Sequence, residues 1–176
     1  PNTAAQAEEL KTIVQKKYPS ALISVEFITA DKLMSLYNSE PDVNVIITLA
    51  DQAITLGKQN EYVTLINIAE YYKFITDSSG NLLKGIFESN VRDYQGSNSV
   101  NSCIADTLRN KDTADFWWLN NGITILSDKI TLITNRQLSI DNPEVVNGLQ
   151  TSREIYNYFS ESKDKLNNES RNVLVR

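Results

Sequence analysis

Apolar and polar residues alternate along this chain with two different periods. From Thr3 to Lys17 apolar side chains recur every three or four residues, with Leu10, Ile13 and Val14 on one face, which predicts a helix. From Ala21 to Thr29 the period is two, which predicts a strand. By the same reasoning we expect helices over 31–37 and 69–75, strands over 43–49 and 62–68, and an ambiguous segment at 54–56.

The second half combines short strands and helices around clear turns. The segment from Asp77 to Asn81 is the clearest turn, because Asp, Ser, Gly and Asn all favour turn conformations. A helix from Ser99 to about Arg109 places Val100, Ile104 and Leu108 at helical spacing. The other expected elements are helices over 82–89 and 148–159, a strand meander over 123–126, 130–133 and 137–140, a strand at 145–146, a charged, flexible stretch over 160–170, and a strand at 173–176. The predicted fold class is α+β, a mixed sheet with flanking helices.

Composition limits the chain to one domain, or one domain with a small extension. Its 176 residues are 41% hydrophobic, enough for a normal core, and we expect an N-terminal α/β extension or linker region over 1–60 and a core over 61–176. The net charge of −5 gives no global attraction to nucleic acid, so any such contact needs a local basic patch or another domain. No apolar run is long enough to cross a membrane, and the single cysteine fits a reducing cytosol.

The chain contains no histidine. This excludes Ser–His and Cys–His nucleophile pairs, histidine-ligated zinc sites and the usual general base near neutral pH. Any chemistry must therefore depend on carboxylates, Lys, Arg, Tyr, amides or a hard metal ion such as Mg²⁺.

Three polar segments lie between apolar runs, at residues 87–96, 116–125 and 143–153. Each places amides, glycine or arginine beside large hydrophobic side chains. Amides in such surroundings are expected to be partly buried, and buried amides must be hydrogen-bonded, so they position either the backbone or a ligand. Because the same chemistry recurs three times at element ends, we expect the three segments to converge around one cleft.

In their order and spacing these segments resemble the AIPR family, the abortive-infection phage-resistance proteins of bacteria. The residues that carry the resemblance are Phe87 with Asn90–Tyr94 and Gly96, Val100–Asn101 with Thr107–Leu108, Phe116–Trp117 with Asn120–Thr124, and Val145–Gly148 with Gln150–Thr151. The resemblance implies a cytoplasmic phage-defence setting and a nuclease-like domain elsewhere in the same, longer chain. Residues 61–176 would then be an AIPR core domain truncated at its C-terminus.

The segment Asn147-Gly148-Leu149-Gln150 is the strongest local candidate for a ligand site. A strand, then Asn-Gly, then a helix start offers N–H groups to an anion such as phosphate. The segment is also similar to the DGQHR and DGQQR signatures of the ParB/sulfiredoxin-like superfamily, which implies a core of that kind and a nucleotide with Mg²⁺ as cofactor. Here Asn147 replaces the carboxylate and Thr151 follows the Gln, which puts hydrolysis in doubt. The structural alternative is an ordinary helix start braced by a buried amide.

The other two segments also allow a binding and a structural interpretation. Arg92 could bind a phosphate bidentately, or it could pair with Asp93 or another carboxylate and brace the fold. The Trp117-Trp118 pair with the following amides could stack and read a base. The favoured alternative is that one Trp anchors the core and that Asn-Asn-Gly is a tight turn.

Our leading hypothesis is a nucleic-acid- or nucleotide-binding regulatory module of a phage-defence protein. The predicted ligand-binding residues are Asn90, Arg92, Asn120, Asn121, Asn147, Gly148, Gln150, Thr151 and Arg153. The alternatives are a ParB-like Mg²⁺-dependent NTPase or nuclease using Glu88, Asp93 and Gln150, and a protein-interaction module that senses a phage component. The Asp-x(n)-Glu-x-Lys pattern of restriction-type nucleases is missing, so we expect no metal site and no catalysis from this segment alone.

Overall fold

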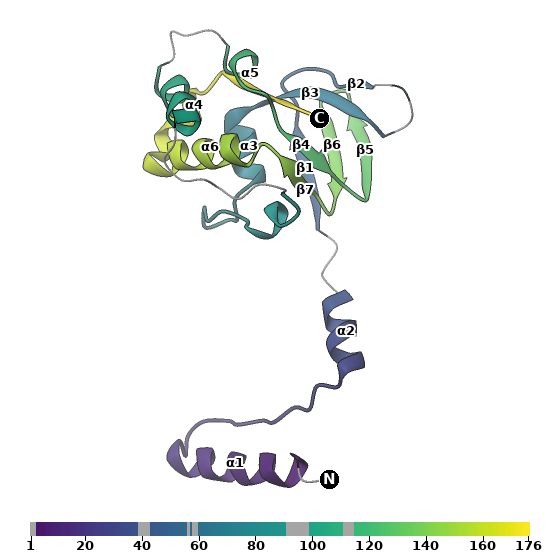
Figure 1. Cartoon of the computed structure of the whole chain (residues 1–176), viewed down its shortest axis with the longest axis vertical. Helices are drawn as coiled ribbons and strands as arrows, with labels where there is room; N and C mark the ends of the chain where they lie inside the picture. Colours follow the sequence, from purple (N-terminus) through teal and green to yellow (C-terminus); the bar gives the residue numbers. More distant parts are fainter. Residues whose placement is uncertain (1–2, 39–42, 56, 58–59, 91–98, 111–114) are drawn as a thin grey trace. The chain divides into compact units, whose positions relative to one another are not determined.

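The computed structural model describes residues 3–38, 43–55, 57, 60–90, 99–110 and 115–176, and divides the chain into two units, Pro1–Pro41 and Asp42–Arg176. The first unit contains two helices, α1 (Thr3–Lys17) and α2 (Ala30–Asn38), as predicted (Figure 1). The strand predicted over 21–29 is wrong. That segment pairs with no strand in the described part of the chain, and Leu22 is fully exposed, so its alternation has no sheet to join.

The second unit contains short, mostly antiparallel strands. One sheet has the order β1-β6-β5, another β2-β3-β8, and β4 pairs with β7. Their bounds are β1 (Asn44–Thr48), β2 (Ile54–Thr55), β3 (Tyr62–Asn67), β4 (Thr124–Leu126), β5 (Lys129–Thr134), β6 (Gln137–Asp141), β7 (Glu144–Asn147) and β8 (Asn172–Val175).

The last two of these sheets continue into one another. The N–H of Ile123 donates to the carbonyl of Leu174 and that of Ile125 to the carbonyl of Arg176, both at 2.9 Å, beside a parallel bridge between Ile123 and Val175. The predicted meander is therefore only partly right. The hairpin of β5 and β6 is confirmed, but β4 pairs with β7 and leads away from β5.

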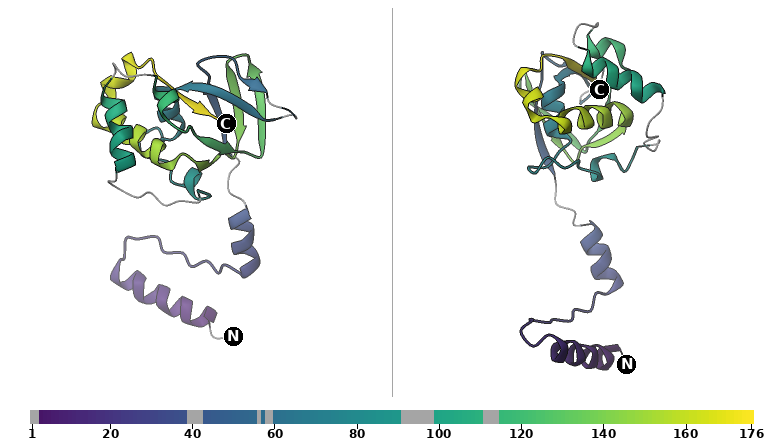
Figure 2. Two further views of the ribbon diagram at one scale, coloured as in Figure 1. Left: turned by 45° about the horizontal axis from the view of Figure 1, so that its top comes forward. Right: turned by 90° about the vertical axis from the view of Figure 1, so that its left-hand side faces the viewer.

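Helices α3 (Ile68–Phe74), α4 (Ser99–Arg109) and α6 (Leu149–Glu161) lie together beside the strands (Figures 1 and 2). A short helix, α5 (Phe116–Leu119), and two 3₁₀ helices, η1 (Gly85–Phe87) and η2 (Lys163–Asn168), complete the described elements. The core between helices and strands includes the fully buried side chains of Ile66, Tyr71, Phe116, Ile155, Phe159 and Val173. The predicted α+β class is confirmed, and no helix among the described residues is long and apolar enough to span a membrane.

Two further stretches contain structure that the sequence did not predict. The helix expected over 82–89 is only the 3₁₀ turn η1, because Thr76 bridges Leu82 and the N–H of Leu83 donates to the carbonyl of Ile75 instead. The stretch over 160–170, expected to be charged and flexible, contains η2 and the buried carboxylate of Glu169. In both places a tertiary contact overrides the local pattern.

Candidate functional site

A pocket of about 300 Å³ lies where the three polar segments meet helix α4. Its lining includes residues 119–122, residues 147–151 and Asn90. The lining also includes one face of α4, with Val100, Cys103, Ile104 and Thr107. The expectation that the segments converge is confirmed for the parts of them that the structure describes.

Most of the predicted ligand-binding residues line this pocket. They are Asn90, Asn120, Asn121, Asn147, Gly148, Gln150 and Thr151. Arg153 is on α6 but is not among the lining residues, while Arg92 and Asp93 lie outside the described residues. Glu88 is exposed and also does not line the pocket.

Sequence reasoning missed the wall that α4 provides. The sequence places Val100, Ile104 and Leu108 at helical spacing, and in the structure Ile104 and Leu108 are buried. Val100 is 60% exposed, however, and Cys103 beside it is also exposed. The only signal in the sequence was the spacing itself, which cannot distinguish a core face from a pocket wall.

Two asparagines both brace the backbone and line the pocket. The side-chain N–H of Asn90 donates to the carbonyl of Val145 at 3.1 Å, and that of Asn120 donates to the carbonyl of Phe116 at 2.8 Å. Each amide therefore fixes its own segment through a nitrogen, as expected for partly buried amides. The backbone carbonyl of Asn121 accepts from Arg176 at 3.1 Å, which fixes the next residue of the same wall.

Helix α6 begins at the pocket without a side-chain cap. Its N-cap residue is Gly148, in the left-handed region at φ 98° and ψ 17°. The Oδ1 atom of Asn147 accepts from the N–H of Gly148 at 2.9 Å, one position before the helix. The N–H groups of a helix's first turn have no partner within the helix, and here that turn lines the pocket.

Gly148 is required by packing against the rest of the fold. A Cβ atom there would lie 2.8 Å from Cγ1 of Ile123 and 3.1 Å from the carbonyl oxygen of Gly122. The absence of a side chain at Gly148 therefore serves the close approach of residues 122–123 to the start of α6.

A buried hydrogen bond joins the start of α6 to α3. The hydroxyl of Ser152 donates to the carbonyl of Gly148 at 2.8 Å, and it lies 2.7 Å from the hydroxyl of Tyr71. Because the single hydroxyl hydrogen of Ser152 is already used, Tyr71 must be the donor to Ser152. Burial raises the pKa of Tyr71 well above its usual range, so this phenol stays protonated.

The aromatic residues of the second segment divide between core and surface. Phe116 is 1% exposed, Trp117 is half-buried and Trp118 is 72% exposed. The two indole rings meet edge to face with centroids 5.2 Å apart. The fully buried anchor is thus Phe116, where the sequence suggested a tryptophan, because the single turn of α5 directs only its first residue inward.

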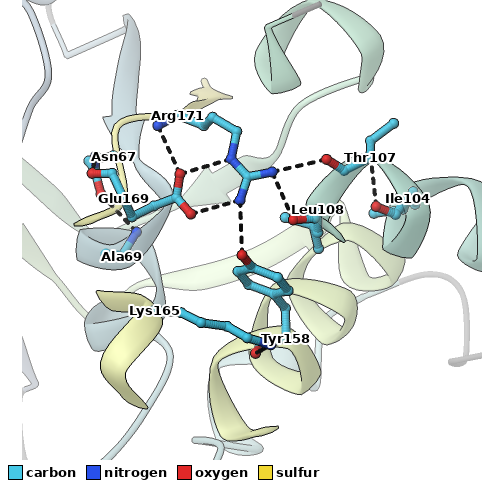
Figure 3. A network of polar contacts seen from close by, with 9 residues as sticks. All are labelled: Asn67, Ala69, Ile104, Thr107, Leu108, Tyr158, Lys165, Glu169 and Arg171. Atoms are coloured by element: carbon cyan, nitrogen blue, oxygen red, sulfur yellow. Dashed lines mark hydrogen bonds and ion pairs between the residues drawn. The ribbon is translucent and has the colours of Figure 1, made fainter. Parts of the chain in front are cut away.

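A second polar cluster lies at the C-terminal end of α4, around Arg171 (Figure 3). Its guanidinium binds both carboxylate oxygens of Glu169, at 2.8 and 2.7 Å, and donates to the carbonyls of Thr107 and Leu108, each at 2.9 Å. The Glu169 side chain is 1% exposed. The hydrogen bond to Glu169 raises the pKa of Arg171. This cluster closes the C-terminal end of α4, and Thr107 also lines the pocket, so the cluster holds the pocket wall in place.

The pocket is electrically neutral in its described part. None of the described lining residues has a charged side chain, and no group of three or more Asp, Glu or Cys residues in the described part of the chain could hold a metal ion. The arrangement supplies amide groups, two hydroxyl groups, a thiol and aliphatic surface, which suit a small ligand with both polar edges and apolar faces.

The fold and the pocket together define an α+β module with a neutral, amide-lined ligand pocket. Comparison with known families identifies it further: the chain belongs to the AIPR family, whose model, described as AIPR protein, matches residues 87–176. That range contains the whole described lining of the pocket and the Arg171 cluster. Membership fits a module of a bacterial abortive-infection, phage-defence protein. No curated protein and no solved structure matches the chain, and the similarity to ParB/sulfiredoxin-like proteins gains no support.

Proposed function

We propose that this chain is a nucleotide- or nucleic-acid-binding regulatory module of a bacterial abortive-infection protein, acting in the cytoplasm. The observation that carries the proposal is the convergence of three amide-bearing segments on one pocket. Residues from separate parts of the sequence supply the same kind of hydrogen-bonding group there. A fold that needed these amides only as local braces would have no reason to collect them around one opening.

The size and chemistry of the pocket favour a small ligand. Its volume of about 300 Å³ is near the lower end of the range for small-molecule sites, roughly 300–1,000 Å³. Apolar side chains with a few convergent polar groups are the usual composition of such sites. The net charge of −5 disfavours broad binding to a duplex backbone and favours a nucleotide, or one unpaired nucleotide of a strand.

The proposed regulation acts on a nuclease-like domain of the same, longer chain. Helix α4 and the start of α6 both line the pocket, so a ligand that fills it would contact both. A ligand that binds one arrangement of these helices more tightly than another shifts the population toward it, and a partner domain in contact with them can respond.

A protein-interaction module is the second candidate, favoured by the apolar surface beside the pocket. Trp118 is 72% exposed, Leu119 49% and Val100 60%. Exposed apolar side chains grouped near an opening are typical of contact surfaces. The Mg²⁺-dependent enzyme gains less support, because Glu88 does not line the pocket that contains Gln150.

A thermal-shift screen of the whole chain tests the proposal. Nucleotides and short single-stranded oligonucleotides, with and without Mg²⁺, are expected to raise the melting temperature, since a ligand that binds only the folded state stabilises it. Cys103→Trp fills the pocket from an exposed position and should abolish the shift. Asp106→Trp, on an exposed part of the same helix outside the pocket lining, is the matched control.

Two results would contradict the proposal: no shift with any nucleotide or oligonucleotide, or a shift that Cys103→Trp leaves intact. If the nucleotides fail and a phage protein binds the wild type but not Trp118→Ala, the second candidate is favoured.

A further inference from the structure

We infer that the pocket reads a nucleobase, and adenine above the others, through the hydrogen-bonding edge of the base. Asn121 is the proposed reader, and the face of α4 that lines the pocket is the surface that covers the ring. This inference rests on the proposed function and specifies its ligand.

The wall from α4 suits the flat face of a ring. The α4 residues of the lining stand at positions i, i+3, i+4 and i+7, and they therefore share one face of the helix. They are Val100, Cys103, Ile104 and Thr107. Leu119 adds another aliphatic side chain to the lining. Enzymes that bind an unstacked base hold it between apolar or aromatic side chains and read its edge with hydrogen bonds.

The amides around this wall keep hydrogen-bonding groups for a ligand. The side chain of Asn121 is exposed and forms no hydrogen bond with the part of the chain that the structure describes. Asn120 uses its nitrogen on the carbonyl of Phe116, which leaves its oxygen as an acceptor. Asn147 uses its oxygen on the N–H of Gly148, which leaves its nitrogen as a donor. Donors and acceptors are therefore both present at one opening.

The absence of charge in the described lining favours a base over a phosphate. Proteins bind phosphate most strongly with arginine or lysine, and the described lining contains neither. A carboxamide instead offers one donor and one acceptor side by side. That pair matches adenine, to which Asn and Gln bind bidentately through its amino group and a ring nitrogen.

The chain carries its own reporter for this pocket. Cys103 is the single cysteine of the sequence, it is exposed, and it lines the pocket. The rate at which a thiol reagent modifies Cys103 therefore measures whether the pocket is occupied. A ligand at about ten times its Kd should slow this rate by about tenfold.

The experiment compares ligands that share only parts of a nucleotide. The monophosphates of adenosine, guanosine, cytidine and uridine are tested beside adenosine, ribose 5-phosphate, inorganic phosphate, and single strands of oligo-dA and oligo-dT. Adenosine and its monophosphate are expected to protect Cys103 most, and ribose 5-phosphate and phosphate not at all. Protection by oligo-dA without protection by free adenosine would assign the base to a strand; protection by both would admit the free nucleotide.

A pair of matched variants tests the reader. Asn121→Asp keeps the size of the side chain and replaces its donor by an acceptor, so protection by adenosine should fall about tenfold or more, as for a lost bidentate base contact. Asn157→Asp makes the same change at an exposed position of α6 outside the pocket lining and should leave protection unchanged. Both variants should keep the wild-type melting temperature without ligand.

The possible failures separate this inference from the proposed function. If all four nucleotides and ribose 5-phosphate protect Cys103 equally, or if inorganic phosphate protects it as well as the nucleotides do, the pocket does not recognise a base. Nucleotide binding would still stand in that case. Adenosine protection that survives in Asn121→Asp overturns the role of Asn121. The absence of both protection and a thermal shift with every nucleotide overturns the inference and the proposed function together.

Discussion

Two strands of the second unit end in an asparagine that leads toward a helix, and the two junctions differ by one residue. β3 ends at Asn67, and α3 begins directly after it. β7 ends at Asn147, and Gly148 separates it from α6. The same side chain therefore stands at the N-cap of one helix and one position before the N-cap of the other.

This single residue changes what the asparagine does. At the first junction Oδ1 of Asn67 accepts from the N–H of Ala69 at 2.9 Å, and its nitrogen donates to the carbonyl of Glu169 at 2.9 Å. That helix start is capped and tied to the Arg171 cluster. At the second junction Oδ1 of Asn147 accepts, within the described part of the chain, only from the N–H of Gly148. The first turn of α6 is left at the pocket, without a side-chain cap.

The difference shows how a polar residue at an element end can serve either the fold or a ligand. At Asn67 the side-chain amide forms its hydrogen bonds within the protein, with Ala69 and with Glu169 of the Arg171 cluster, so that junction is structural. At the other junction Gly148 occupies the N-cap position and Asn147 stands one residue before it. The start of α6 and the neighbouring pocket residues therefore stay available to a ligand. The following changes break or sharpen this contrast, beginning with the largest expected effect.

Replacing Arg171 with alanine should have the largest effect on the closed junction. Its removal takes the ion-pair partner away from the buried carboxylate of Glu169, and breaking a buried ion pair typically costs about 3–5 kcal/mol of unfolding free energy. The carbonyls at the end of α4 also lose their donor. The measurement is the unfolding free energy from urea denaturation.

The control for this change is Arg109→Ala. Arg109 is an exposed arginine whose nearest carboxylates, on Asp106 and Glu161, lie at 3.7 and 3.9 Å, and surface pairs of this kind contribute less than about 1 kcal/mol. If Arg171→Ala costs no more than the control, the cluster does not brace the junction.

Replacing Gly148 with alanine should strain the open junction itself. A Cβ atom would lie 2.8 Å from the Ile123 side chain in a left-handed backbone conformation, which together should cost about 2–4 kcal/mol. Gly85→Ala is the matched control, since a Cβ atom there meets nothing within 4 Å. An unchanged denaturation midpoint in Gly148→Ala would show that the packing against Ile123 is not required.

Replacing Tyr71 with phenylalanine should weaken the link between the two helices. The loss of one buried hydrogen bond to Ser152 is expected to cost about 1 kcal/mol near neutral pH. The folded-state pKa of Tyr71 is raised above its usual value of 10.0, so its stabilising contribution is present below pH 10 and is lost as the pH rises beyond that value. The wild type should therefore lose stability more steeply than Tyr71→Phe as the pH rises above about 10.

Melting curves across that pH range provide the test, with Tyr18→Phe as a control at a tyrosine that is 54% exposed. Identical pH profiles for the wild type and Tyr71→Phe would mean that this phenol ionises as readily in the folded protein as in the unfolded one.

Replacing Asn67 with alanine removes the cap of α3 and should cost about 1 kcal/mol, the usual effect of losing an N-cap side chain. The bond to the carbonyl of Glu169 is lost as well, so the effect should shrink in an Arg171→Ala background, where the cluster is already broken. Strictly additive effects of the two changes would show that cap and cluster act independently.

The sequence predicts the local elements of this fold well and its long-range pairings poorly. The periods of α4 and β3 depend on neighbouring residues, and both elements form where they were expected. The alternation of apolar and polar residues over 21–29 is as regular as the pattern of β3. A strand also needs a partner strand, however, and none of the described strands pairs with this segment. The pairing of β4 with β7 could not be predicted for the same reason, because it depends on where β7 lies in the folded chain.

The same limit applies to the candidate site. The three amide-bearing segments could be found from residue types alone, and the structure collects their described parts at one pocket. The role of Gly148 could not be found in this way, because it is decided by Ile123, which is distant in sequence. The buried ion pair of Glu169 and Arg171 could not be predicted either. In the sequence it looks like any pair of charged loop residues, and only the burial of its side chains in the folded protein sets it apart.

The smallest expected effect on stability belongs to Asn147→Ala, and it tests the contrast most directly. The Asn147 side chain is exposed, and among the described residues it bonds only to the N–H of Gly148, which water can satisfy. The change should therefore alter the unfolding free energy by less than about 0.5 kcal/mol. Nucleotide protection of Cys103 should nevertheless weaken, because a donor at the opening is lost. Asn67→Ala, the same change at the other junction, should show the opposite balance: a loss of stability with little change in ligand affinity at equal folded fraction. If Asn147→Ala destabilises the protein as much as Asn67→Ala does, both junctions are braced alike, and the start of α6 is no more open to a ligand than that of α3.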